Sequence, residues 1–118
     1  MSGVEYTPQK GDIVRINFSP SSGQEIKKYR PALVISNAKY SKLTGLVLVC
    51  PITHAENNRL INSGLFVAIK SKNINGYVNP LQFHTFDFRR RGIELVGHVS
   101  SKLLSSVIEV IDDVVHGE

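Results

Sequence analysis

Short hydrophobic runs, separated by turn residues, make up most of the chain. Residues 12–18 alternate, with Val14, Ile16 and Phe18 on one face, which predicts a half-buried strand. Continuous apolar runs at 32–36 and 46–52 are typical of strands covered on both faces. Shorter strands are expected at 65–70, 77–83 and 93–96.

Polar segments separate these runs. Residues 24–30 and 53–64 are expected to be loops, and residues 37–45 form a polar connection that ends in a turn. His84 falls in a polar break between Phe83 and Phe86. The connections are short enough for one small sheet.

The C-terminal segment has a different period. From Ser101 the apolar residues recur at i, i+3, i+4 and i+7, which predicts an amphipathic helix. Ser100 or Ser101 can supply its N-cap, and Gly117 lies just past its end. About six short strands closed by a helix indicate a mainly β fold, a small barrel or strongly curled sheet, in a single domain over residues 1–118.

Charge is distributed unevenly along the chain. The formal net charge is +4, but four of the ten acidic residues lie in the last ten positions, which contain no Lys or Arg. The remainder of the chain is therefore strongly basic, which favours a polyanionic partner such as nucleic acid.

Several function classes find no support. The chain has no phosphate-binding glycine loop and no HExxH, CxxC or GxSxG motif. Its four histidines, at 54, 84, 98 and 116, form no pair at metal-ligand spacing, so neither a metal nor a cofactor is expected. The single Cys50 lies in an apolar run and is expected to be a buried small hydrophobe. No signal peptide or membrane span is expected.

Three polar residues stand out by position. Glu25 and Arg30 lie in the loop between the first two strands, and Thr53 ends the third. A carboxylate, a guanidinium and a hydroxyl at one rim of a curled sheet suit phosphate-ester chemistry. Spacing alone favours the alternative, a solvated hairpin tip with Arg30 packed on its own strand. His54, directly after Thr53, and His84 are the other candidates for proton transfer.

Basic residues provide a candidate RNA-binding surface. They are Lys27, Lys28, Arg89, Arg90 and Arg91. They either track a nucleic-acid backbone or form a solvated face. Three phenylalanines, Phe83, Phe86 and Phe88, interleave with these basic residues. Stacking on RNA bases is the alternative for one or two of them, and core packing is expected for most.

Four motifs occur in order within 43 residues. They are Gly11-Asp12-Ile13-Val14, Phe18-Ser19-Pro20 with Gly23-Gln24-Glu25, Arg30-Pro31-Ala32-Leu33-Val34-Ile35-Ser36 and Pro51-Ile52-Thr53. Together they resemble the N-terminal half of the MazF/PemK (Kid-like) family of ribonuclease toxins. Gly76, Gln82, residues 89–92 and the closing helix extend the likeness more loosely.

The resemblance implies an SH3-like curled barrel with a C-terminal helix, assembled as a two-fold homodimer. It implies the toxin of a type II toxin–antitoxin system, located in the cytoplasm, that inhibits translation and growth. Such a toxin cleaves single-stranded mRNA at selected sequences without a metal, leaving a 2′,3′-cyclic phosphate and a 5′-hydroxyl. An acidic, partly disordered antitoxin is the implied partner, and it would compete with RNA for the basic groove.

Carried over residue by residue, the resemblance makes Arg30 and Thr53 the functional pair and Glu25 the loop acid. Gln82 matches a residue near the RNA groove, and His84 is a further candidate for RNA binding. Many members have an acid just before that glutamine, where this chain has Leu81, so the general base is Glu25 or no single residue. Two rival functions are a non-catalytic barrel toxin that inhibits DNA gyrase and a basic nucleic-acid-binding module.

Overall fold

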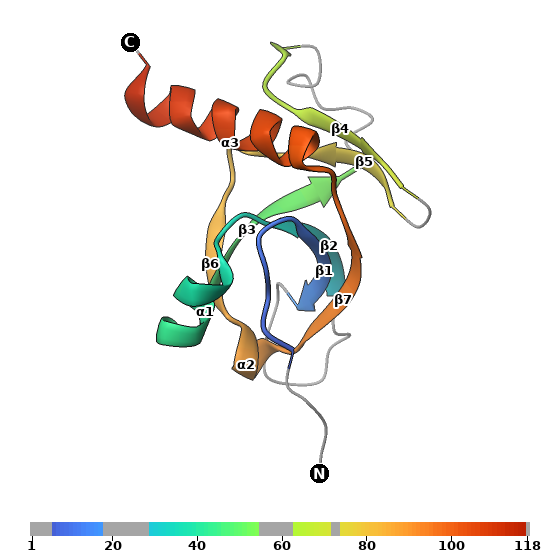
Figure 1. The fold of residues 1–118 in the computed structure, drawn as a ribbon. Helices are drawn as coiled ribbons and strands as arrows, with labels where there is room; N and C mark the ends of the chain where they lie inside the picture. Colours follow the sequence, from blue (N-terminus) through green and yellow to red (C-terminus); the bar gives the residue numbers. More distant parts are fainter. Residues whose placement is uncertain (1–5, 18–28, 55–62, 72–73, 118) are drawn as a thin grey trace.

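The computed structural model describes residues 6–17, 29–54, 63–71 and 74–117. A strongly curled antiparallel sheet fills this part of the chain, with one long helix across it (Figure 1). The strands are β1 (Asp12–Asn17), β2 (Tyr29–Val34), β3 (Leu46–Thr53), β4 (Val67–Lys70), β5 (Asn75–Val78), β6 (His84–Asp87) and β7 (Ile93–His98). The helices are α1 (Ala38–Thr44), α2 (Phe88–Arg91) and α3 (Ser101–His116). The predicted mainly β fold with a C-terminal helix is confirmed.

β3 is the strand around which the sheet curls. The strand order is β4-β5-β3-β2-β1-β7, and β6 also pairs with β3. The first half of β3 pairs with β6, from Leu46 to Val49, and its last two residues, Ile52 and Thr53, pair with β5. On its other edge β3 pairs with β2. Because one strand changes partner along its length, the sheet bends instead of remaining flat.

Hydrophobic side chains form two core layers, one on each face of the curled sheet. One layer lies between the sheet and α3, and its buried members are Ile13, Leu33, Cys50, Ile52, Ile69, Ile74, Val78, Val99 and Val107. The other fills the curl and contains Val14, Ile16, Ala32, Val34, Val47, Val49, Phe86 and Phe88. The prediction that the runs at 32–36 and 46–52 are covered on both faces is confirmed. Burial raises the pKa of the Cys50 thiol to about 12, as expected for a structural cysteine.

The first strand is more buried than its alternation predicts. All residues of β1 except Arg15 are buried, Asn17 included. β1 lies between β2 and β7, and Ile13 packs in one core layer while Val14 and Ile16 pack in the other. The prediction of a half-buried strand is therefore wrong, because long-range packing covers both faces.

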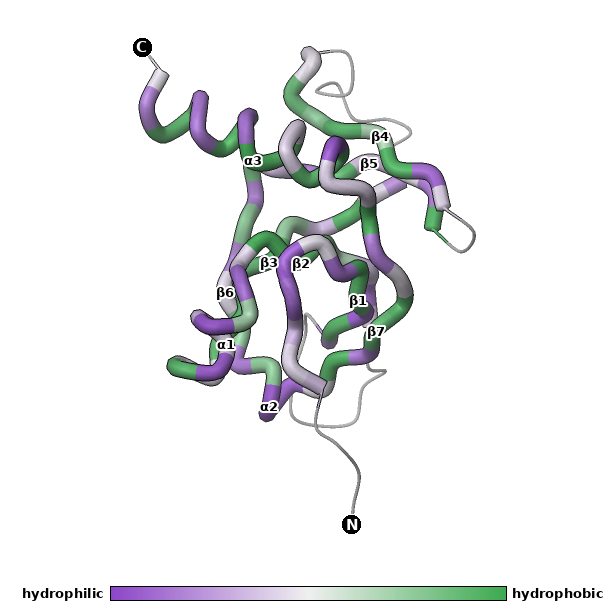
Figure 2. The backbone as a smooth tube through the Cα atoms, viewed as in Figure 1, coloured by the Kyte–Doolittle hydropathy of each residue, from purple (hydrophilic) through white to green (hydrophobic). Residues whose placement is uncertain are grey.

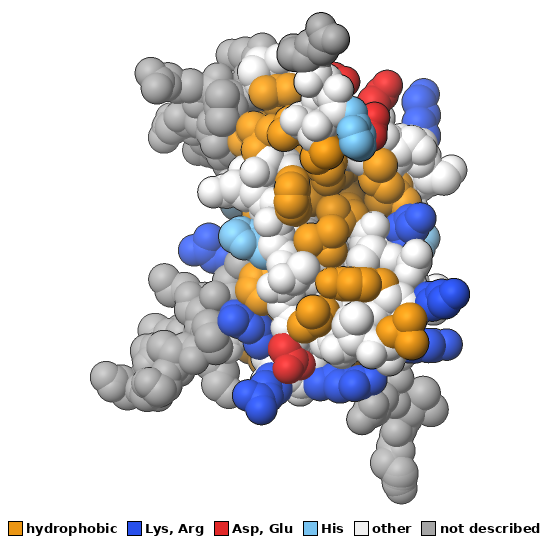
Figure 3. All heavy atoms as spheres, turned by 90° about the vertical axis from the view of Figure 1, so that its left-hand side faces the viewer, with side chains coloured by type: hydrophobic (Ala, Val, Ile, Leu, Met, Phe, Trp, Pro, Cys, Tyr) orange, Lys and Arg blue, Asp and Glu red, His pale blue; other side chains and the backbone are white. Residues whose placement is uncertain are grey.

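Helix α3 follows the predicted pattern. Ser100 is its N-cap, with Oγ accepting the Leu103 N–H at 3.1 Å, and Gly117 ends it. Its apolar stripe alternates with polar positions along the helix (Figure 2) and packs on the sheet. Near its end, however, Val114 and Val115 stay exposed, and Figure 3 shows a band of hydrophobic side chains down the face that includes this end of the helix.

Three elements were absent from the sequence prediction: α1, the single-turn helix α2 and β6. The polar segment 37–45 contains α1, capped by Asn37, whose Oδ1 accepts the Tyr40 N–H at 2.8 Å, and by Gly45 in the left-handed conformation. The polar break around His84 belongs to β6, whose pairing with β3 supplies the order that its sequence lacks. The loop predicted at 24–30 is also wrong at its end, because β2 already begins at Tyr29.

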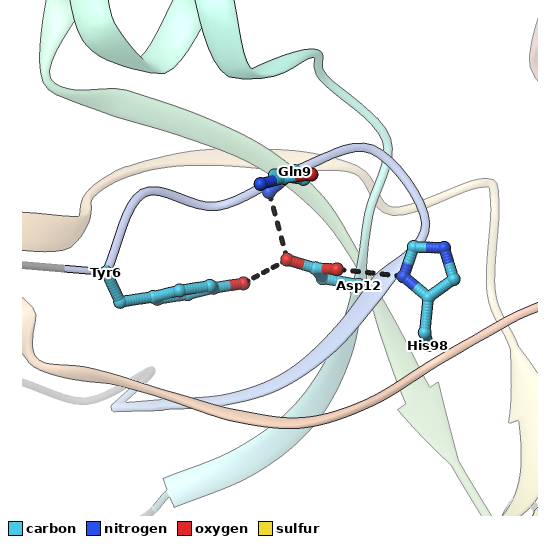
Figure 4. Close-up of polar contacts among 4 residues, drawn as sticks. All are labelled: Tyr6, Gln9, Asp12 and His98. Carbon is cyan, nitrogen blue, oxygen red and sulfur yellow. Dashed lines mark hydrogen bonds and ion pairs between the residues drawn. The ribbon is translucent and has the colours of Figure 1, made fainter.

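A buried carboxylate ties the N-terminal segment to the sheet (Figure 4). Asp12 accepts hydrogen bonds from the Tyr6 hydroxyl and, at 3.0 Å, from the Gln9 N–H, and its other oxygen lies 2.9 Å from Nδ1 of His98. Burial, reinforced by the bond to Asp12, raises the pKa of Tyr6 well above its ordinary value. Gly11 has φ +94°, and a Cβ there would lie 3.2 Å from the His98 ring. The Gly11-Asp12 motif is therefore structural.

Candidate RNA-binding cleft

A cleft opens where β2 and β3 separate. Their ladder ends at the pair Ala32 and Pro51, and the same register continued by two residues would place Arg30 opposite Thr53. The ladder with β2 does not continue to this pair, and Thr53 pairs with Tyr77 of β5 on the opposite edge of β3. Proline has no N–H with which to extend a ladder, and Pro31 and Pro51 both lie at the point of separation. The result is a cleft of about 720 Å³ with Arg30 and Thr53 both in its lining.

The cleft combines basic and polar side chains with apolar prolines and isoleucines. Its lining residues are Arg15, Tyr29, Arg30, Pro31, Pro51, Ile52, Thr53, His54, Ile74, Asn75, Asn79, Gln82 and His84. Two arginines and two histidines are among them, and no described residue in the lining carries a carboxylate. Such a surface suits an anionic ligand with groups that accept hydrogen bonds.

Arg30 lies in a strand, not in the loop that the sequence predicted. It is the second residue of β2, pairs with Ile16 of β1, and its side chain is exposed. Strand pairing fixes the backbone that carries the guanidinium, which a solvated loop would not do. Residues 24–28 of the alternative hairpin tip lie outside the described residues, and Arg30 is exposed and lines the cleft.

Thr53 is held at the opposite wall by a close backbone contact. It is the last residue of β3 and pairs with Tyr77. A Cβ on Gly76 would lie 2.5 Å from the Thr53 carbonyl oxygen, so β5 can approach this closely only with glycine at position 76. Gly76, which the sequence resemblance included, therefore helps to place Thr53.

The structure brings several predicted residues together and leaves others apart. Gln82, His54 and His84 line the cleft with Arg30 and Thr53. Arg89 and Arg91 do not: the Arg89 guanidinium lies 5.4 Å from the Phe88 ring centroid, and that of Arg91 lies 4.6 Å from the Phe86 ring centroid. Glu25, Lys27 and Lys28 lie outside the described residues.

Most of the aromatic residues near the basic run lie in the core, as expected. Phe86 and Phe88 are buried in the core, and Phe83 is 41% exposed. Arg91 also donates from Nη1 to the Asn17 carbonyl oxygen at 3.3 Å, which attaches α2 to the end of β1. Part of the basic run therefore has a structural role.

Sequence reasoning did not single out Arg15, Tyr29 or Asn79. Arg15 pairs with Pro31 across the β1–β2 hairpin, so its position depends on a register that the sequence did not define. Asn79 precedes Pro80, a dipeptide that favours turns, and this was the available indication.

The part of the chain that the structure describes contains no group of three His, Cys, Asp or Glu side chains suited to hold a metal ion. None of its helices is long and apolar enough to cross a membrane.

Comparison with known proteins agrees with this architecture. Two relatives from Escherichia coli align over 102 residues each. The endoribonuclease toxin MazF of strain K12 is 28% identical, and the alignment covers 86% of this chain and 88% of MazF. The endoribonuclease PemK is 26% identical, and the alignment covers 85% of this chain and 76% of PemK. A MazE–MazF crystal structure from Deinococcus radiodurans superposes with a TM-score of 0.82 at 28% identity, covering 97% of this chain and all of that one.

The family model for the PemK-like, MazF-like toxins of type II toxin–antitoxin systems matches residues 9–115. This range includes all of the described strands and the whole cleft. The chain belongs to the PemK-like, MazF-like toxin family.

Proposed function

We propose that this toxin is a sequence-selective, metal-independent endoribonuclease that cleaves single-stranded mRNA and thereby stops translation and growth. The observation that carries the proposal is the basic cleft, in which Arg30 of β2 and Thr53 of β3 line one cavity with no carboxylate among its described lining residues. The E. coli relatives are named endoribonucleases, which supports the same activity.

RNA supplies its own nucleophile, because the 2′-hydroxyl lies beside the phosphorus atom. The enzyme must take its proton, stabilise the extra negative charge on the pentavalent phosphorane, and return a proton to the leaving 5′-oxygen. The products are a 2′,3′-cyclic phosphate and a 5′-hydroxyl. Arg30 stabilises the charge, since its planar guanidinium binds two phosphate oxygens, and Thr53 donates one further hydrogen bond. The guanidinium retains its proton throughout.

The general base is assigned to Glu25, which matches the family's acidic position and lies outside the described residues. Leu81 occupies the position at which many family members have another acid. In the Glu25→Gln variant the acid limb of the pH–rate profile should flatten, with a rate loss of about 10²–10⁴-fold. An unchanged profile at near-normal rate would exclude Glu25 and transfer the role to His54 or His84, which line the cleft.

The RNA strand is proposed to enter through the cleft and continue over basic residues beyond it. Gln82 and His84 contact the strand inside the cleft, and Arg15 adds a cation next to Pro31. Arg89 and Arg91 contact the phosphate backbone outside the cleft, and Lys27 and Lys28, which lie outside the described residues, are further candidates for phosphate contacts.

Purified protein should cut a long single-stranded RNA into discrete fragments in EDTA. The scheme uses the substrate's own hydroxyl and the charge of Arg30 in place of a metal ion. Gel electrophoresis of the products is the measurement. A mobility shift without cleavage would instead indicate a nucleic-acid-binding module, and inhibition of DNA gyrase with intact RNA would indicate the gyrase-directed toxin. Activity restored only by added magnesium would contradict the metal-free mechanism.

A cognate antitoxin is the proposed protein partner. The Deinococcus radiodurans relative was crystallised as a MazE–MazF complex. An acidic, partly disordered antitoxin segment would compete with RNA for the basic cleft.

We place the toxin in the cytoplasm, where its mRNA substrate lies, as a single toxin domain over residues 1–118.

A homodimer is proposed from the apolar side chains on one face. Leu43 of α1 is 75% exposed, and Val114 and Val115 of α3 are 57% and 60% exposed. Figure 3 shows a band of hydrophobic side chains on the side of the molecule where α1 and the end of α3 lie in Figure 1, and an exposed apolar patch typically marks an interface.

Light scattering should therefore give about twice the 13.1 kDa chain mass. Val115→Asp should lower that mass, because it would bury a charge in the interface. The matched control is Lys102→Asp, on the exposed start of α3. Val67→Asp would not serve as a control, because Val67 of β4 packs on the core. A strict monomer at micromolar concentration that still cleaves RNA would contradict the dimer.

A further inference from the structure

A tight turn carries Gln82 to the rim of the cleft. It follows β5, leads into β6, and comprises residues 79–82. The Asn79 N–H donates to the Pro51 carbonyl oxygen at 2.9 Å, which attaches the turn to β3 two residues before Thr53. Asn79 is only 8% exposed, whereas the Gln82 side chain is exposed and lines the cleft. A buried amide thus supports an exposed one.

The hydrogen bonds of this turn fix which end of the Gln82 amide faces outward. The Leu81 backbone N–H can only donate, and it lies 3.0 Å from Asn79 Oδ1, so this atom is the oxygen. The other end of the Asn79 amide is therefore Nδ2, a donor, and it lies 3.1 Å from Gln82 Oε1. Since Nδ2 cannot accept, the Gln82 oxygen is its acceptor. The Gln82 Nε2 group, with its two N–H donors, is the end directed away from Asn79.

We propose that Asn79 is a specificity-determining residue, which orients Gln82 so that it selects a keto base, uracil or guanine, over an amino base, cytosine or adenine. The inference rests on the proposed function. Uracil O4 and guanine O6 accept hydrogen bonds, whereas cytosine N4 and adenine N6 donate them. Unstacked bases of single-stranded RNA expose these edges to side chains. An N–H facing an amino group would leave both donors unpaired, which disfavours that base.

The variant Asn79→Asp tests this orientation with little change in shape. One carboxylate oxygen still accepts the Leu81 N–H, but the other can only accept from Gln82. The Gln82 amide should then rotate so that Nε2 faces Asp and Oε1 faces the RNA. Gln82→Glu produces the same change at the RNA-facing end and leaves Asn79 in place. Both variants should shift the base preference at the same RNA position, from keto toward amino, by about tenfold or more.

The measurement is cleavage of an RNA pool randomised around the cut site, followed by sequencing of the fragments to obtain relative rates for each base. The matched control is Asn75→Asp, which adds the same charge to the cleft lining from β5. It should lower all rates and leave the base ratio unchanged. Thermal melting of each variant checks that the fold is retained.

Capture of the same pool by Arg30→Ala protein, in which cleavage should be slow, reads the base ratio from binding. If wild-type protein leaves RNA intact but captures keto-containing sequences, and Asn79→Asp shifts this capture toward amino bases, the proposed function fails and the role of Asn79 survives. The inference is overturned if cleavage occurs but neither Asn79→Asp nor Gln82→Glu shifts the base ratio. It is also overturned if the wild-type protein prefers an amino base at the RNA position that Gln82→Glu affects. If wild-type protein neither cuts nor captures the pool, both are overturned.

Discussion

Arg30→Ala should lower the rate of RNA cleavage by about 10²–10³-fold, the usual effect of removing one preorganised charge-stabilising donor from an active site. The Arg30 guanidinium lines the same cleft as Thr53, and its planar fork can bind two phosphate oxygens there. Arg30→Lys should recover only part of the rate, because an ammonium keeps the charge and loses the two-pronged geometry.

The fold should tolerate this change, which separates a catalytic role from a structural one. The Arg30 side chain is exposed, and surface substitutions usually alter stability by no more than about 0.5 kcal/mol. Rate, circular dichroism and melting temperature are measured together. Lys102→Ala is the matched control, since it removes one exposed charge at the start of α3, outside the cleft lining. Activity that fell only in proportion to lost stability would make Arg30 a structural residue.

The elements with a strong hydrophobic period could be predicted from the sequence. Helix α3 shows a 3.6-residue period with a serine N-cap, and β3 is a continuous apolar run, so local chemistry alone defines them. Helix α1 has no apolar stripe and depends on its caps at Asn37 and Gly45. β6 has a single buried residue, Phe86, and is a strand only because β3 lies beside it. Such elements depend on tertiary contacts that single-sequence patterns do not contain.

The candidate site likewise contains residues that the sequence indicated and residues whose position depends on tertiary contacts. Arg30 and Thr53 stood out by position and were assigned as the functional pair by resemblance. The β2–β3 register, which spacing does not reveal, accounts for their presence in one cleft. Arg15 joins the cleft through the β1–β2 register for the same reason. The orientation of Gln82 depends on the Asn79 amide, whose partners became visible only in the folded turn.

The most direct test of the account is a single 2′-deoxy substitution on the nucleotide 5′ to the scissile phosphate. If the 2′-hydroxyl is the nucleophile, removing it takes away the attacking atom and leaves every other contact of the strand in place. The modified oligonucleotide should bind like the all-ribose strand in a competition assay and remain uncut in EDTA, while a 2′-deoxy group one nucleotide further 5′ should still permit cleavage. Cleavage at the deoxy position itself would contradict the account, because the phosphate would then have been attacked by something other than its own 2′-hydroxyl.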